Sequence, residues 1–135
     1  MTELSIKEIL KLRTIAVVGC SNTPGKPGHD IPSYLKGNGY EVIPVNPNAQ
    51  EVLGEKSYPA LLDIPPQRGV DIVEVFRPSI DVPGIVEQVL QMKQKPKVLW
   101  LQTGIRDDSS AEKARKSDIT VVQDKCLMVE HAASV

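Results

Sequence analysis

The sequence has few cysteines, few aromatic side chains and no excess of basic charge. Cys20 and Cys126 are the two cysteines in 135 residues, and their separation forms neither a CxxC redox motif nor a zinc-binding pair. With 16 basic and 17 acidic residues the net charge is −1, so the clustered basic surplus of nucleic-acid-binding proteins is missing. The aromatic content of 4% is too low for a base-stacking platform. These shortages argue against a disulfide scaffold, a metal site and nucleic-acid binding.

Long hydrophobic runs are also missing. No apolar stretch approaches the roughly 18 residues that cross a bilayer, and the first residues lack the basic and apolar segments of a signal peptide. The hydrophobic content of 41% and the charged content of 24% are ordinary for a globular protein, and the length fits one domain. We therefore expect a single domain over residues 1–135 that is cytoplasmic and contacts no membrane.

Short β-branched apolar segments alternate with segments of helical periodicity. The segments expected to be strands are residues 14–18, 41–45, 71–76, 97–101 and 119–122. Because a proline is tolerated in the first turn of a helix, Pro32 predicts a helix that begins close to His29 or Asp30. This alternation predicts right-handed βαβ crossovers and an α/β fold. We expect a Rossmann-like three-layer sandwich with a five-stranded parallel sheet in the order 3-2-1-4-5.

Polar and turn-forming residues follow four of the predicted strands. They are Gly19, Cys20 and Ser21; Asn46 and Pro47; Phe76, Arg77 and Pro78; and Gln102, Thr103 and Gly104. Ligands of open parallel sheets bind at the carboxyl ends of the strands, where the strand order reverses; the predicted order puts that point between the first and fourth strands. The first loop also contains Gly25 and Gly28 and leads into a helix, an arrangement that presents N–H groups to a phosphate. An ordinary connecting loop is the alternative interpretation.

The first loop does not match the two common phosphate-binding motifs. Ser21 stands where the dinucleotide motif has its second glycine, and Asn46 stands where an acidic residue would bind the ribose. In addition, five residues separate Gly19 from the next Gly-Lys pair, and Pro27 replaces the magnesium-binding serine or threonine of a P-loop. Ordinary NAD binding and nucleotide hydrolysis are therefore disfavoured, and a phosphorylated ribose suits the second strand end better.

Five motifs occur in a characteristic order. They are Gly19-x-Ser21 with Pro24, Val45-Asn46-Pro47, Phe76-Arg77-Pro78, Trp100-Leu101-Gln102-x-Gly104 and Asp124-x-Cys126-x-x-x-Glu130-His131. This combination resembles the stand-alone CoA-binding domain proteins, which are similar to the N-terminal domain of the succinyl-CoA synthetase α-subunit. The resemblance implies a Rossmann-like fold that binds coenzyme A across the strand ends.

The resemblance also implies a role for each loop. It places Gly19, Cys20, Ser21, Asn22 and Thr23 at the phosphates and adenosine, Asn46 and Pro47 at the adenosine end, Phe76, Arg77 and Pro78 along the cleft, and Gln102, Thr103 and Gly104 at the pantetheine side. Because coenzyme A carries several negative charges and the chain is slightly acidic, cations must be concentrated locally. The candidates are Lys26, Lys56 and Arg77, although Arg77 could instead pair with Glu74 or Asp81.

Catalysis would require a nucleophile, a base and a group that orients the base. His29 and His131 are the two histidines, and we interpret both as surface or structural residues. Cys20 follows a strand in a loop of N–H groups, which can activate a thiol, but we favour the interpretation that it is a small residue at the strand end. The chain is too short to include the phosphohistidine domain of the synthetases. We therefore expect a CoA- or acyl-CoA-binding protein without catalytic residues. The alternatives are a non-catalytic subunit of an acyl-CoA synthetase-like complex and an NAD(H)-type redox sensor.

Overall fold

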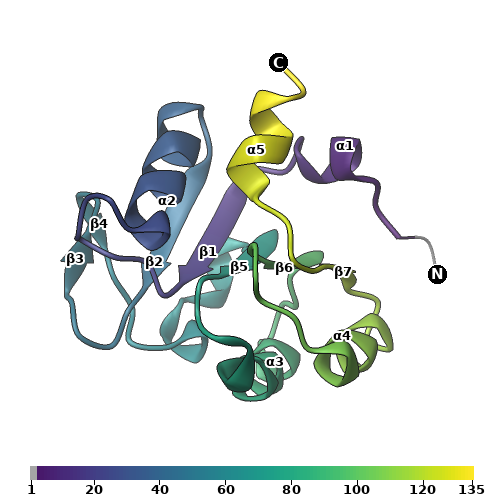
Figure 1. Ribbon diagram of the computed structural model, residues 1–135. Coiled ribbons are helices and arrows are strands. Elements are labelled where there is room, and N and C mark those ends of the chain that lie inside the picture. The colour runs from purple at the N-terminus through teal and green to yellow at the C-terminus, as the bar shows by residue number, and fades with distance from the viewer. Residues whose placement is uncertain (1–2) are drawn as a thin grey trace.

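The computed structural model describes residues 3–135 and contains a five-stranded parallel sheet with helices on both faces (Figure 1). The strands are β1 (Thr14–Val18), β2 (Glu41–Val45), β5 (Ile72–Val75), β6 (Val98–Leu101) and β7 (Thr120–Val122). They lie in the order β2-β1-β5-β6-β7, and every neighbouring pair is parallel. A small antiparallel hairpin of β3 (Glu51–Val52) and β4 (Glu55–Lys56) stands beside β2. The Rossmann-like α/β class is confirmed.

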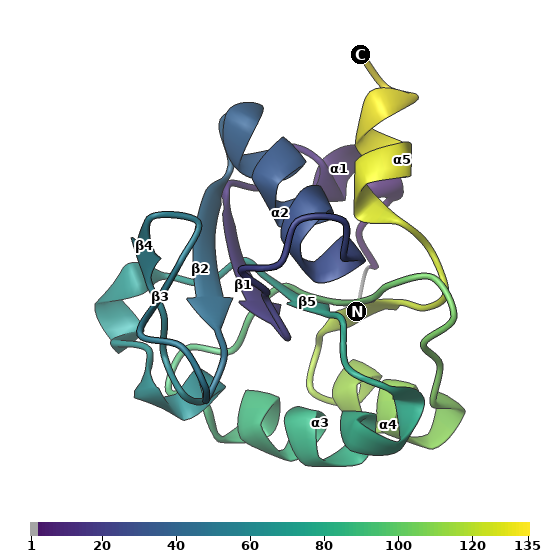
Figure 2. The ribbon, with the colours of Figure 1, turned by 60° about the vertical axis from the view of Figure 1, so that its left-hand side comes forward.

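The helices form two layers, one on each face of the sheet (Figure 2). One layer contains α1 (Ile6–Ile9), α2 (Pro27–Gly37) and α5 (Leu127–Ala132), and the other contains α3 (Val82–Gln91) and α4 (Asp108–Arg115). Three short 3-10 turns, η1 (Leu61–Asp63), η2 (Pro66–Arg68) and η3 (Ser79–Asp81), connect these elements. Each layer packs its own hydrophobic cluster against the sheet. The strands are therefore covered on both faces, which explains their almost continuous apolar sequences.

The predicted strand order is wrong in one respect. The third strand of the chain, β5, does not lie at the edge beyond β2 but pairs with β1 on one side and β6 on the other. The cause is Pro44 in the middle of β2: a proline lacks the N–H that a ladder on both sides needs, so β2 belongs at an edge. The strand order therefore reverses between β1 and β5, rather than between β1 and the fourth strand.

The start of α2 also differs from the prediction. The helix begins at Pro27, not near His29, and Pro32 lies inside it. A proline in that position cannot donate to the carbonyl four residues earlier, which belongs to Gly28. The Ser21 N–H donates to that carbonyl instead, with an N···O distance of 2.9 Å. The loop before α2 thus replaces the hydrogen bond that the proline removes.

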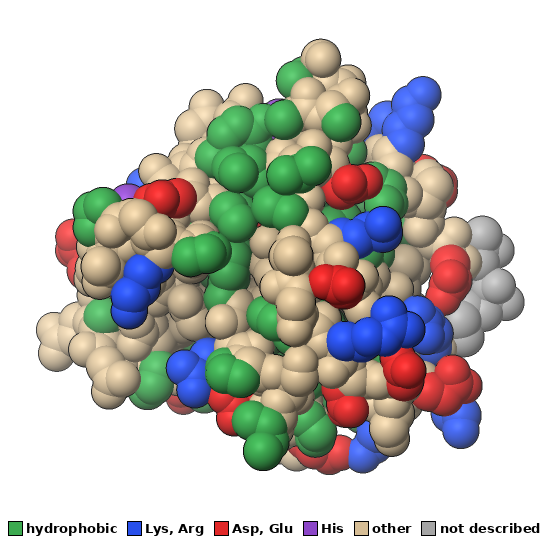
Figure 3. All heavy atoms as spheres, viewed as in Figure 1, with side chains coloured by type: hydrophobic (Ala, Val, Ile, Leu, Met, Phe, Trp, Pro, Cys, Tyr) green, Lys and Arg blue, Asp and Glu red, His purple; other side chains and the backbone are tan. Residues whose placement is uncertain are grey.

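The outer surface carries both signs of charge. On the face shown in Figure 3, basic and acidic side chains lie interspersed, and hydrophobic side chains gather over the upper part of this face, around α5. Within residues 3–135, no helix is long and apolar enough to cross a membrane.

One ionisable side chain is buried in the middle of the sheet. Glu74 of β5 is 0% exposed and stands between Val17 of β1 and Trp100 of β6 in the sheet register. Neither of its carboxylate oxygens has a hydrogen-bond partner among the described residues. Burial raises the pKa of Glu74 from 4.5 to about 8. The folded protein therefore carries a neutral Glu74 at neutral pH.

The neutral carboxyl makes stability depend on pH. Between about pH 5 and about pH 8 the folded state keeps a proton that the unfolded state has lost, so the free energy of unfolding falls by up to about 1.4 kcal/mol per pH unit. Above about pH 8 both states are ionised and this slope ends. We expect Glu74→Gln to remove the slope, as measured by urea unfolding at several pH values. Glu112→Gln, on the exposed side of α4, should keep it; parallel pH profiles for the two variants would contradict the assignment.

Candidate functional site

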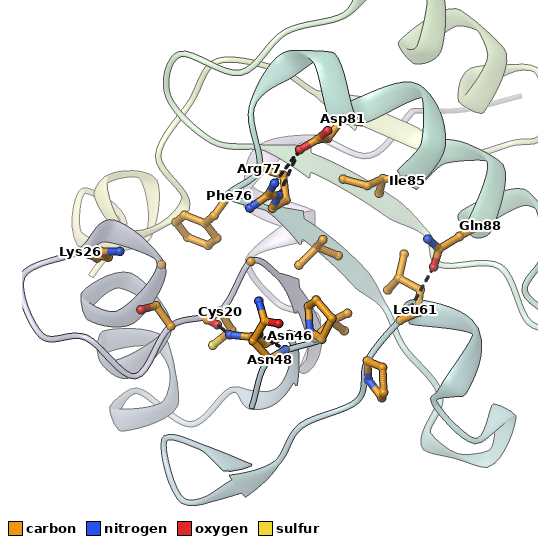
Figure 4. A pocket seen from close by; sticks show the side chains of 18 of the residues that line it. Cys20, Lys26, Asn46, Asn48, Leu61, Phe76, Arg77, Asp81, Ile85 and Gln88 are labelled. Atoms are coloured by element: carbon orange, nitrogen blue, oxygen red, sulfur yellow. Dashed lines mark hydrogen bonds and ion pairs between the residues drawn. The ribbon is translucent and has the colours of Figure 1, made fainter. Parts of the chain in front are cut away.

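A cavity of about 690 Å³ opens at the carboxyl ends of β1, β2 and β5 (Figure 4). Its walls are the start of α2, one face of α3 and the segment that leads into η1. The structure brings together at this cavity eight of the residues predicted from the sequence: Gly19, Cys20, Ser21, Lys26, Asn46, Pro47, Phe76 and Arg77. The cavity thus lies where the strand order reverses, the usual ligand position in open parallel sheets.

The loop between β1 and α2 is held by backbone contacts. The Gly19 N–H donates to the Val45 carbonyl over 3.1 Å, and the Ser21 N–H donates to the Gly28 carbonyl. Gly19 has a φ of +87°, which favours glycine. A Cβ atom at Gly28 would lie 2.6 Å from the Gly19 carbonyl oxygen, so only glycine allows α2 to approach the loop this closely. The glycines therefore bring the loop and the N-terminus of α2 to the same side of the cavity.

Asn46 connects the end of β2 to this loop. Its Nδ2 donates to the Cys20 carbonyl over 2.9 Å, and its Oδ1 accepts from the Asn48 N–H over 2.7 Å. An aspartate in this position would face the Cys20 carbonyl with an acceptor instead of a donor. The amide therefore has a structural role, and the end of β2 presents no carboxylate to the cavity.

Cys20 is buried and not activated. Its side chain is 0% exposed, and burial together with the nearby Glu74 raises the pKa of the Cys20 thiol to about 12. A nucleophilic cysteine needs the thiolate, which such a pKa suppresses at neutral pH. The packing interpretation of Cys20 fits the structure better than the catalytic one.

The cavity contains two cations and one carboxylate. Lys26 lies exposed at the start of α2, and no ion pair of Lys26 is found within residues 3–135. Arg77 pairs with Asp81: its Nε and Nη2 lie 3.1 and 2.9 Å from the same carboxylate oxygen. Both partners are partly exposed at the cavity wall, as Figure 4 shows. Of the two partners considered for Arg77, the structure therefore has Asp81 and not Glu74.

Several predicted residues do not line this cavity. In the first loop, the Asn22 side chain donates to the Glu51 carbonyl over 2.8 Å, and the Thr23 N–H donates to the Ser21 hydroxyl. Lys56 lies 5.2 Å from the ring centre of Tyr58. It lines a second, adjoining hollow that shares Pro47, Asn48 and Pro59 with the first.

The end of β6 lies two strands away from β1. Gln102 is buried there, and its side-chain oxygen accepts from the Leu127 N–H over 3.0 Å. The Gly104 N–H donates to Asp124, while Thr103 is exposed. Pro78 precedes η3 outside the cavity. The residues Gln102, Thr103 and Gly104 therefore stay a prediction without support from the cavity.

The structure adds a wall that sequence reasoning missed. Asp81 at the N-cap of α3 and Ile85 and Gln88 within the helix occur at i, i+4 and i+7 and line the cavity. Gln88 also accepts from the Leu61 N–H over 3.1 Å and so holds the opposite wall. The helical spacing of Val82, Ile85, Val86 and Val89 predicts this helix, but the predicted strand order gives no reason to place it beside the first loop.

Both histidines lie outside the cavity. His29 contacts Asp30 on α2, with 2.8 Å between the ring nitrogen and the carboxylate. His131 of α5 shares a hydrogen bond of 2.8 Å with the Tyr34 hydroxyl. Within residues 3–135, no group of three histidine, cysteine or acidic side chains could hold a metal ion. The cavity is therefore lined by two cations that could face an anion, and neither histidine lines it.

Solved structures with the same fold cover nearly the whole chain. A protein of Thermus thermophilus solved as cell-free ID.343 has 39% identity and a TM-score of 0.88, and the match covers 98% of this chain and 100% of that protein. A hypothetical protein of Pyrococcus horikoshii OT3 has 36% identity and a TM-score of 0.88, with 95% and 88% of the two chains covered. These similarities confirm the architecture from β1 to α5.

Sequence relatives fall into two groups. Protein YneT of Bacillus subtilis (strain 168) is 37% identical over 134 residues, which cover 98% of this chain and 96% of YneT. Acetate–CoA ligase [ADP-forming] II of Archaeoglobus fulgidus is 38% identical over 96 residues, which cover 70% of this chain and 14% of the ligase. The CoA binding domain model matches residues 13–132. The chain therefore belongs to the CoA-binding domain family.

Proposed function

We propose that this protein binds coenzyme A or an acyl-CoA in the cavity at the ends of β1, β2 and β5, and that it catalyses no reaction of its own. The observation that carries the proposal is the loop from Gly19 to Ser21, held by the Gly28 carbonyl beside the N-terminus of α2. The Gly19 and Ser21 N–H groups are bound within the protein and fix the loop, so the favourable feature for a phosphate is the adjacent N-terminus of α2, the positive end of the helix dipole. Membership of the CoA-binding domain family supports the same ligand.

In this proposal, each wall of the cavity contacts a different part of coenzyme A. The pyrophosphate lies against the loop, with Lys26 and Arg77 as counter-charges. The adenosine lies near Asn46 and Pro47, and the adjoining hollow with Lys56 can extend the site for the phosphorylated ribose. A volume of about 690 Å³ is within the usual range for small-molecule sites. The apolar side chains of Phe76 and Ile85 provide a lining for the pantetheine arm.

The site suits binding better than catalysis. The Cys20 thiol is buried with a raised pKa, and neither histidine reaches the cavity. The similarity to ADP-forming acetate–CoA ligases favours a second candidate function, in which this protein presents an acyl-CoA to a separate catalytic chain. Acyl transfer that occurs only after the protein is mixed with such a partner would support this second function. An NAD(H) sensor is disfavoured because no carboxylate follows β2.

Isothermal titration tests the ligand directly. We expect coenzyme A to bind with a dissociation constant at least about tenfold lower than that of NADH, a difference of about 1.4 kcal/mol. The reason is that Asn46 offers no acceptor pair to an unmodified ribose, whereas the cations of the cavity favour the additional phosphate of coenzyme A. Equal or tighter binding of NADH would refute the proposed ligand.

A charge in the loop should weaken binding. Ser21→Glu places a carboxylate against the pyrophosphate, and we expect the affinity for coenzyme A to fall at least about tenfold, or ~1.4 kcal/mol. Ser21→Gln is the matched control because it has the same size and also loses the hydroxyl that accepts from the Thr23 N–H. If both variants bind equally in calorimetry while circular dichroism shows a native fold, the loop does not hold the anion.

Removal of the cavity carboxylate should strengthen binding. Asp81→Asn frees Arg77 from its ion pair and removes a negative charge, so we expect coenzyme A to bind about threefold more tightly, a modest change because both side chains are partly exposed. Asp108→Asn is the control, since Asp108 pairs with Arg106 away from the cavity and the net charge changes equally. The same affinity in both variants would show that Arg77 has no part in binding.

A further inference from the structure

The buried Glu74 has no structural explanation in the packing of the sheet. It lies one residue before the end of β5, on the face of the sheet that carries Val17 and Trp100. A carboxyl without a partner in an apolar cluster destabilises the fold, whereas valine or isoleucine would pack there without this cost. Its position below the strand ends puts it close to the loop that we propose to hold the anion.

Cys20 links Glu74 to that loop. The Cys20 side chain belongs to the same buried cluster, and Glu74 acts electrostatically on its thiol. The backbone of Cys20 carries the loop: its carbonyl accepts from Asn46, and the next N–H, that of Ser21, donates to the Gly28 carbonyl. A charge on Glu74 therefore acts on the residue whose two neighbouring peptide groups fix the loop.

No cation compensates a charge on Glu74 from the surrounding elements. On α2, His29 contacts Asp30. The Tyr34 hydroxyl on α2 shares a hydrogen bond with His131 of α5. The Tyr40 hydroxyl, before β2, donates to the Leu10 carbonyl after α1. Cys126, at the start of α5, packs against the cluster, and Lys7 and Glu8 of α1 are exposed. Ion pairs to Glu74 are absent among residues 3–135, and Lys26 lies exposed beyond the loop.

We propose that Glu74 makes anion binding by the β1–α2 loop sensitive to pH. As the neutral acid it leaves the loop in the conformation described above. As a carboxylate it repels an anion in the loop, so the affinity falls as the pH rises. Because linkage is reciprocal, a bound anion also makes Glu74 harder to ionise. Only the identity of the ligand in this inference rests on the proposed function.

Acetyl-CoA is the probe because it has no free thiol and its phosphate monoester, with a second pKa of about 6, is almost fully ionised above about pH 7. Calorimetry between about pH 7 and about pH 9.5 should show a loss of affinity of about tenfold in the unmodified protein and in Glu112→Gln, centred near the pKa of Glu74, about 8. Glu74→Gln should change less than about twofold over this range. An equal loss in Glu74→Gln would overturn the inference.

A second measurement separates this inference from the proposed function and needs no variant. In the ligand-free protein, the carboxyl carbon of Glu74 and the amide groups of Cys20 and Ser21 should titrate together by nuclear magnetic resonance, with a midpoint near 8. A Glu74 carboxyl that titrates near its ordinary pKa of 4.5, or loop amides that do not respond, would refute the coupling. If the loop titrates as expected but acetyl-CoA binds at no pH, the proposed ligand is wrong and the coupling stands.

Discussion

The hydrogen bond from the Ser21 N–H to the Gly28 carbonyl holds the site together. In an uninterrupted helix the residue four positions after Gly28 would occupy that carbonyl, but this residue is Pro32, which has no N–H. The carbonyl is therefore free to anchor the preceding loop. Since Gly28 also has no side chain, α2 can approach the Gly19 carbonyl closely. The same two residues, which weaken the helix by themselves, position the loop at the cavity.

The strand order determines which side chains share the cavity with that loop. Because β5 pairs directly with β1, Arg77 leaves the sheet beside Gly19, and a Cβ atom on Gly19 would come within 3.3 Å of the Arg77 side chain. The helix that follows, α3, then brings Asp81, Ile85 and Gln88 to the same opening. With β5 at the far edge of the sheet, the loop would face none of them. The position of β5 beside β1, rather than any local motif, therefore brings Arg77, Asp81 and the apolar side chain of Ile85 to the cavity.

Local patterns in the sequence predicted most elements, and errors arose where a distant partner decides the outcome. The apolar runs predict all five strands, and the spacing of Val82, Ile85, Val86 and Val89 is that of a helix, because burial on one or two faces leaves a direct sequence pattern. The strand order depends on pairing between distant segments, although Pro44 already indicated an edge strand. The predicted start of α2 is wrong because a proline inside a helix leaves a carbonyl four residues earlier without its donor, here that of Gly28, and the prediction assumes that no other donor replaces it. Ser21, eleven residues earlier, supplies that donor.

The negative charges around the cavity follow one principle. At the proposed coenzyme A site, a free carboxylate nearby would weaken binding, because low dielectric strengthens repulsion as much as attraction. The end of β2 has an amide in Asn46, Asp81 is paired with Arg77, and Glu74 is neutral because it is buried. Of these three arrangements, the first is fixed by the residue type and the second is a surface pair that salt weakens. The third depends on a proton, which is the basis for the proposed pH dependence of anion binding at the loop.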